Sequence, residues 1–221
     1  MSILSLKNIN YTYEGAFSPV LNNVSVDFEE GKLYVIMGKS GSGKSTLLSL
    51  ISGLDYSTGG DILYNGENVR ELDKDDYRAK KVGVIFQGYN LLTTKTALEN
   101  IVLSMNISES EVSNKKEYAL NLLKKMGIDN ETAQRKVLKL SGGEQQRISI
   151  ARALANNSNV IIADEPTGNL DSEMQEQIMD ILKNLAKEQN KCVIVVTHSK
   201  QVSKYANELY GLNSGKLVFV K

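Results

Sequence analysis

Four short stretches of the chain are apolar at nearly every position and are rich in Val and Ile. They are residues 33–37, 82–86, 160–163 and 192–197. A strand that is buried on both faces of a parallel sheet shows such a continuous run, because helices cover both sides of the sheet. The pattern therefore predicts a parallel sheet that contains these four strands.

Other segments show periodic rather than continuous hydrophobicity. Residues 4–9 and 24–28 alternate between apolar and polar side chains, which predicts strands with one buried face. Apolar stripes with helical spacing follow or separate the buried strands. They lie in residues 45–54, 111–126, 148–155 and 174–185. Strands that alternate with helices indicate an α/β fold with a parallel sheet.

The segment 89–156 contains no continuous apolar run of the strand type. We therefore interpret it as a helical subdomain inserted into an α/β core made of residues 1–88 and 157–221. The length of 221 residues fits one large domain with a subdomain.

Composition narrows the function classes. Lys and Arg number 26 and Asp and Glu number 26, so the net charge is zero, and we expect no nucleic-acid partner. No apolar run approaches the ~20 residues of a membrane span, and the N-terminus lacks a signal-peptide pattern. These features predict a cytoplasmic location. The single cysteine, Cys192, falls in an apolar run and is predicted to be a buried strand residue.

Residues 38–45 read GKSGSGKS and match the pattern G-x-x-x-x-G-K-[ST]. The match follows a predicted strand and opens a predicted helix, which is the context that this phosphate-binding motif requires and that an accidental match would lack. Glycines let backbone amides approach phosphate oxygens, and the helix N-terminus adds positive potential. Lys44 can bridge the β- and γ-phosphates, and the Ser45 hydroxyl can bind Mg²⁺. The predicted ATP contacts are Gly38, Ser40, Gly41, Ser42, Gly43, Lys44, Ser45 and Thr46.

Two carboxylates, Asp164 and Glu165, directly follow the apolar run 160–163. Ligands of parallel sheets bind beyond the carboxyl ends of the strands. Asp164 is therefore predicted to hold Mg²⁺. The next side chain points elsewhere, so Glu165 is predicted to act as general base or to orient the attacking water. The alternative is a solvated acidic turn before Pro166.

A second glycine turn, LSGGEQQR at residues 140–147, precedes the predicted helix 148–155. Ser141 and two glycines at a helix N-terminus can bind an anion. Ser141 can equally cap the helix with Glu144 in a capping box, and both roles can hold together.

This second turn resembles the signature of ATP-binding-cassette (ABC) ATPases, and the motifs follow the family's order along essentially the whole chain. The resemblance implies a P-loop NTPase (RecA-like) core with an N-terminal antiparallel β subdomain and an inserted α-helical subdomain. It also implies that two copies pair head to tail around two Mg-ATP. Ser141 and Gly143 of one copy would then contact the γ-phosphate held by the other, and Gly142 would belong to the same nucleotide-binding turn.

The resemblance assigns roles to further residues. Gln87 would reach Mg²⁺ and the attacking water, and His198, the only histidine, would contact the γ-phosphate. Asp171 would help to couple the two sites, although a helix cap explains it equally well. Tyr13 would stack on adenine, with Tyr11 as the neighbouring alternative. The resemblance thus implies a catalytic set of Glu165, His198, Gln87 and Lys44, and a metal set of Ser45, Gln87 and Asp164.

The string ADEPTGNLD at residues 163–171 resembles the ABC group of macrolide and peptide exporters, lipoprotein-release systems and the septum-forming cell-division complex. The expected function is ATP hydrolysis that drives a separate integral-membrane permease, with the chain peripheral on the inner face of the membrane. The segment 93–96, where the permease is expected to dock, departs from the common pattern. The alternative is a soluble ABC ATPase that acts on ribosomes or DNA.

Overall fold

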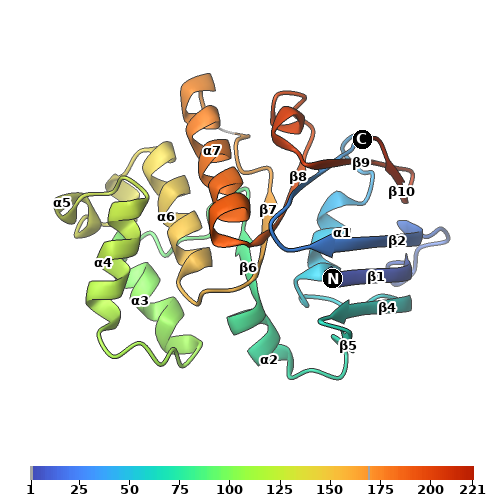
Figure 1. Ribbon diagram of the computed structural model, residues 1–221, viewed down its shortest axis with the longest axis horizontal. Helices are drawn as coiled ribbons and strands as arrows, with labels where there is room; N and C mark the ends of the chain where they lie inside the picture. The colour runs from blue at the N-terminus through green and yellow to red at the C-terminus, as the bar shows by residue number, and fades with distance from the viewer. Residues whose placement is uncertain (1, 169) are drawn as a thin grey trace.

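The computed structural model of the chain describes residues 2–168 and 170–221 (Figure 1). Its centre is a six-stranded sheet of order β10-β9-β3-β8-β7-β6. The strands are β3 (Leu33–Met37), β6 (Val82–Ile85), β7 (Val160–Asp164), β8 (Cys192–Thr197), β9 (Glu208–Asn213) and β10 (Lys216–Phe219). All neighbours pair in parallel except β10, which pairs antiparallel with β9. The prediction of a parallel sheet from four buried runs is therefore confirmed, and Cys192 is buried in β8.

A second sheet of order β2-β1-β4-β5 is antiparallel throughout. It contains β1 (Ser2–Tyr11), β2 (Leu21–Glu29), β4 (Gly59–Tyr64) and β5 (Glu67–Asn68). Its apolar face, with Phe28 among its buried side chains, shares a core with Tyr34 of β3 and Leu47 of helix α1 (Lys44–Ile51). This sheet is the antiparallel β subdomain that the family resemblance implies.

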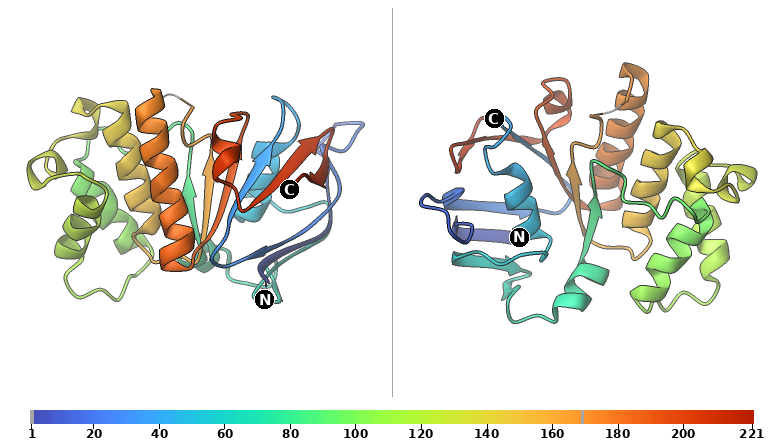
Figure 2. Two further views of the ribbon diagram at one scale, coloured as in Figure 1. Left: turned by 45° about the horizontal axis from the view of Figure 1, so that its top comes forward. Right: turned by 180° about the vertical axis from the view of Figure 1, so that it is seen from behind.

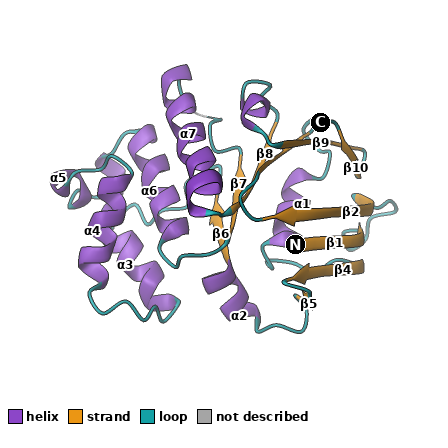
Figure 3. Cartoon of the chain, viewed as in Figure 1, coloured by secondary structure: helices purple, strands orange, loops and turns teal. Residues whose placement is uncertain are grey.

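Helices α6 (Gly142–Leu154) and α7 (Ser172–Gln189) pack on the opposite face of the six-stranded sheet (Figures 1 and 2). Helices α3 (Ala97–Ile107), α4 (Lys115–Lys125) and α5 (Asn130–Ala133) lie beyond α6, where α3 and α4 pack against it and α5 packs on both. One apolar core runs from β3, β7 and β8 to α3, α4, α6 and α7. Within the described part of 89–156, helices and turns alternate, with one isolated bridge between Thr96 and Lys136 (Figure 3). We propose that 89–156 is a helical subdomain of a single domain 1–221, because its core is continuous with the sheet.

Several boundaries differ from the sequence prediction. Helix α1 ends at Ile51 rather than near 54, because Ser52 caps it and Gly53 turns left-handed with φ +70°. Helix α4 begins at 115, where the Asn114 side chain accepts a bond from the Glu117 amide. A short helix, α2 (Lys74–Asp76), and a π-helical turn (Tyr77–Lys81) precede β6, and the sequence pattern did not predict them. Among the described residues, no helix is long and apolar enough to cross a bilayer.

Candidate active site

The loop between β3 and α1 forms a tight phosphate loop, residues 38–45. Gly41 and Gly43 adopt φ of +77° and +100°, a region that favours glycine. A Cβ at Gly38 would lie 2.4 Å from the Ser42 hydroxyl and 2.6 Å from the Leu212 carbonyl oxygen. Glycine at these positions therefore lets the backbone close into the curve that the motif predicts.

Polar groups of this loop fit a polyanionic phosphate group. The Lys44 ammonium donates to the carbonyl oxygens of Gly38 at 2.8 Å and Lys39 at 3.0 Å, which keeps the cation over the loop. The Ser42 hydroxyl is buried and has no hydrogen-bond partner among the described residues. A buried polar atom of this kind needs a partner, and a phosphate oxygen would supply it.

The metal-binding prediction involves Ser45 at the start of α1 and Asp164 at the end of β7. The Ser45 hydroxyl donates to Asp164 Oδ2 at 3.3 Å. Burial raises the pKa of Asp164 above its ordinary value, and the Ser45 hydroxyl and Lys44 partly oppose this effect. A hydroxyl and a carboxylate side by side are oxygen donors that suit a hard cation such as Mg²⁺.

Glu165 follows in a left-handed conformation, φ 46°, which turns its side chain away from that of Asp164. The carboxylate is 9% exposed and bonded at both oxygens. The Thr197 hydroxyl donates to Oε2 at 2.8 Å, and His198 Nδ1 lies 2.7 Å from Oε1. The structure thus joins Glu165 to His198, two residues that the sequence placed separately. Thr197 was not among the predicted site residues, although it ends a predicted buried strand.

Gln87 lies on the exposed loop after β6. Its Nε2 is 3.9 Å from the position that a Cβ on Gly168 would take, and the Gly168 amide donates to the Glu165 carbonyl at 3.1 Å. The loops that carry Gln87 and Glu165 are therefore adjacent, as a shared catalytic site requires.

The signature turn, residues 140–147, caps helix α6. Ser141 accepts from the Glu144 amide at 3.3 Å, and the Glu144 carboxylate accepts from the Ser141 amide at 2.7 Å. The predicted capping box is therefore confirmed. The Ser141 hydroxyl also lowers the pKa of Glu144. Ser141 and Gly142 are exposed, and within the described residues no hydrogen bond joins this turn to the phosphate loop.

Helix α7 begins beside the signature turn. The Asp171 side chain caps α7 by accepting from the Met174 amide at 2.9 Å, so the cap alternative for Asp171 holds. A Cβ at Gly143 would lie 2.9 Å from Met174 Sδ. Asn169, part of the string that narrowed the family branch, lies outside the described residues.

The two tyrosines at the end of β1 have different environments. Tyr11 is buried and donates to Asp55, which raises the pKa of Tyr11 to about 12. Tyr13 is 50% exposed, and its hydroxyl lies 2.8 Å from Thr46 Oγ1. The rings meet edge to face with centroids 4.9 Å apart. Tyr13 therefore offers the accessible π-face beside the phosphate loop, and the buried Tyr11 ring packs against it.

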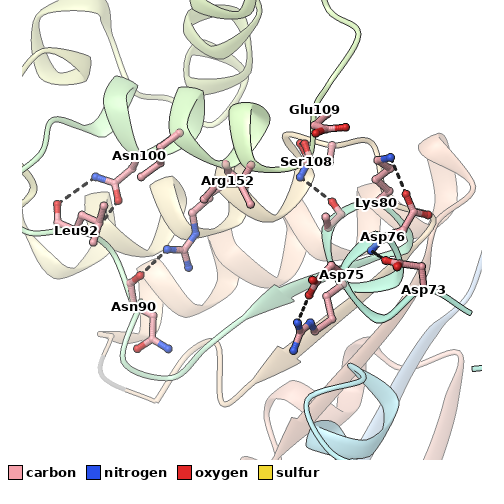
Figure 4. A pocket seen from close by; sticks show the side chains of 16 residues that line it. Asp73, Asp75, Asp76, Lys80, Asn90, Leu92, Asn100, Ser108, Glu109 and Arg152 are labelled. Atoms are coloured by element: carbon pink, nitrogen blue, oxygen red, sulfur yellow. Dashed lines mark hydrogen bonds and ion pairs between the residues drawn. The ribbon is translucent and has the colours of Figure 1, made fainter. Parts of the chain in front are cut away.

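A groove of about 880 Å³ opens on the side of the molecule where the Gln87 loop meets α3 and α6 (Figure 4). Leu92, Leu103 and Ile107 supply exposed apolar surface along it. Its polar lining includes Asp75, paired with Arg78, and Asp76, paired with Lys80 at 2.6 Å. The lining of the groove thus combines exposed apolar side chains with charged side chains, two of which are paired within the segment that precedes β6.

Comparisons with known proteins agree with this geometry. The ABC transporter family matches residues 21–168. An uncharacterized ABC transporter ATP-binding protein of Bacillus subtilis, YclH, is 43% identical over 215 residues, with 97% of this chain and 95% of that protein covered. The macrolide export ATP-binding/permease protein MacB of Mannheimia succiniciproducens is 43% identical over 223 residues, which cover 99% of this chain but 34% of MacB.

The fold also matches solved structures. The cassette MJ0796 of Methanocaldococcus jannaschii, described as a dimer in a post-hydrolysis state bound to ADP and Pi, superposes with a TM-score of 0.90 at 38% identity. The superposition covers 99% of this chain and 98% of that one. The chain therefore belongs to the ABC transporter family and is one of its ATP-binding, ATP-hydrolysing cassettes.

Proposed function

We propose that this cassette drives a separate membrane permease, of the branch that exports peptides, antibiotics or lipoproteins or transmits mechanical force. The proposed role in ATP hydrolysis rests on the buried Glu165 carboxylate, which is hydrogen-bonded to Thr197 and His198. A fixed carboxylate at the strand ends, beside the phosphate loop, is suited to orient or deprotonate a water molecule.

The other site residues bind the phosphates, the metal ion and the adenine base. Lys44 and the amides of the phosphate loop bind and neutralise the phosphates, and His198 donates toward the γ-phosphate. Ser45, Asp164 and Gln87 would hold Mg²⁺, which would offset phosphate charge. Tyr13 binds the adenine ring by stacking. Such a site acts mainly by positioning and charge neutralisation, because phosphoryl transfer needs little covalent chemistry from the protein.

The exposed signature turn supports a dimeric working state. Ser141, Gly142 and Gly143 sit at the N-terminus of α6, an anion-binding position, yet no hydrogen bond of the described residues links them to their own phosphate loop. A second copy, arranged head to tail, would bring its signature turn to the γ-phosphate. The dimeric MJ0796 structures support this arrangement by similarity.

The groove of Figure 4 is the proposed docking place for the permease. The exposed apolar side chains beside the Gln87 loop would let a docked membrane-protein segment respond to changes at the catalytic site. Docking there would hold the chain on the inner face of the membrane. The name of MacB, which combines ATP-binding and permease parts, supports a permease partner for this chain by similarity.

A pull-down tests this function. A tagged Glu165→Gln chain with ATP, in mild detergent, should recover a permease that mass spectrometry identifies, and Leu103→Asp in the groove should abolish the recovery. Leu138→Asp, at an exposed position of the helical segment outside the groove, is the matched control. Recovery of ribosomal or DNA-repair proteins alone would contradict the membrane function and support the soluble alternative.

A further inference from the structure

The loop that follows Gln87 has an unusual backbone. Tyr89 and Asn90 are consecutive, neither is glycine, and their φ values are 58° and 50°. Non-glycine residues rarely adopt this left-handed region, so two in succession persist only when the surroundings fix them. The question is which groups of the molecule impose this conformation.

Arg152, near the end of helix α6, is the group that binds this part of the loop. One of its guanidinium nitrogens donates to the Tyr89 carbonyl at 3.0 Å. The other donates to the Asn90 carbonyl (Figure 4). A planar guanidinium is rigid enough to fix two neighbouring carbonyls at once. Arg152 forms no ion pair among the described residues, and burial lowers its pKa, so its donors serve the backbone instead of a carboxylate.

The same loop residue reaches the other end of α6. A Cβ at Gly142, in the signature turn, would lie 3.1 Å from the Tyr89 hydroxyl. Tyr89 therefore connects two parts of α6: the guanidinium of Arg152 holds its backbone, and its hydroxyl lies against the first turn. Farther along the chain, the Asn100 side chain bonds both the amide and the carbonyl of Leu92, at 2.8 and 3.2 Å, which fixes the next stretch to α3.

We propose that Arg152 is a positioning residue that makes the Gln87 loop and the signature turn move as one body. The inference rests on the proposed function, in which Gln87 serves the ATP of its own copy and the signature turn serves the ATP of the other. A response of the loop at one site would then shift Ser141–Gly143 at the second site through α6. Arg152 touches neither nucleotide and acts through the backbone of Tyr89 and Asn90.

Arg152→Lys tests the proposal, because an ammonium keeps the charge and the stem but lacks the rigid fork. We expect kcat for ATP to fall about tenfold or more, while KM and the affinity for nucleotide stay within twofold. The chain has no tryptophan. Leu92→Trp would therefore give a single fluorescent reporter of the loop, and its ATP-induced change should shrink when Arg152→Lys is added. Arg135→Lys, an exposed arginine of the same helical segment, should change none of these readouts.

Two outcomes would overturn the proposal. One is kcat and loop fluorescence of Arg152→Lys within twofold of the parent chain. The other is loss of nucleotide affinity together with a large drop in Tm, which would make Arg152 a purely structural residue. Failure of the proposed function itself is distinguishable, because the parent chain and Glu165→Gln would then form no dimer with ATP, whatever the kcat of Arg152→Lys.

Discussion

Glu165 takes its orientation from two residues on the neighbouring strand end. Parallel pairing sets Asp164 opposite Val196, so the residues that follow, Glu165 and Thr197, meet just beyond the sheet. The left-handed φ of Glu165 then turns its carboxylate toward Thr197 and His198. The two carboxylates were predicted from their place after an apolar run, and the family resemblance pointed to His198. Sequence reasoning missed Thr197, because the register between β7 and β8 cannot be derived from either strand alone.

Asp164 should give the apo chain a measurable pH dependence. Burial raises its pKa in the folded state, so the folded chain keeps this proton to a higher pH than the unfolded chain does. Above the raised pKa the buried carboxylate is charged, which lowers the free energy of unfolding. This loss of stability disappears as the pH falls toward the unfolded pKa of roughly 3.9. Asp164→Asn should therefore raise Tm near neutral pH by a few degrees, with a gain that shrinks as pH falls. Thermal unfolding at several pH values measures this difference in Tm, with Asp180→Asn at an exposed position as the control. A Tm of Asp164→Asn below that of the parent chain at every pH would refute the prediction.

Tyr13 should contribute to nucleotide affinity through its ring. Stacking of a base on an aromatic side chain is worth about 1–3 kcal/mol, so Tyr13→Ala should weaken ATP binding by roughly 5- to 150-fold. Tyr13→Phe keeps the ring and loses only the contact with Thr46, so its affinity should remain close to that of the parent chain. Titration of a fluorescent ATP analogue measures both, and equal affinity for all three chains would exclude Tyr13 as the platform.

At the scale of elements, helix α6 links the signature turn to the Gln87 loop and depends on its cap. The reciprocal bonds of Ser141 and Glu144 satisfy orphan amides of the first turn. Glu144→Ala should lower the free energy of unfolding by about 1 kcal/mol. Chemical denaturation tests this, with Glu173→Ala in the first turn of α7 as matched control, because the α7 cap is Asp171. Equal stability of the two variants would show that the cap contributes nothing.

The elements also show what the sequence could predict. The four buried strands and helix α7 carry continuous or strongly periodic apolar patterns, which follow directly from burial. Strands β4, β5, β9 and β10 were not predicted, because they are short, most of their residues are half-exposed or exposed, and their pattern carries little signal. The clamp of Arg152 on the Gln87 loop was also missed, since it joins residues 62 and 63 positions apart in the sequence.

At the scale of the whole molecule, two surfaces would bind partner proteins in the proposed function. One carries the phosphate loop and the signature turn, which a second copy would complete. The other is the groove between α3, α6 and the segment that precedes β6, which a permease would fill (Figure 4). The Gln87 loop lies between them. This arrangement allows events at the nucleotide to reach the membrane without the substrate touching the chain.

The most direct test of an ATP-bound dimer that depends on Glu165 for turnover is the oligomeric state of Glu165→Gln. Sedimentation velocity with Mg²⁺ and ATP measures this state. The amide keeps the shape of the carboxylate but cannot act as a base, so turnover should fall about 100-fold or more while nucleotide stays bound. We expect a dimer with ATP and a monomer with ADP or without nucleotide. A monomer under all three conditions, or turnover equal to that of the parent chain, would contradict it.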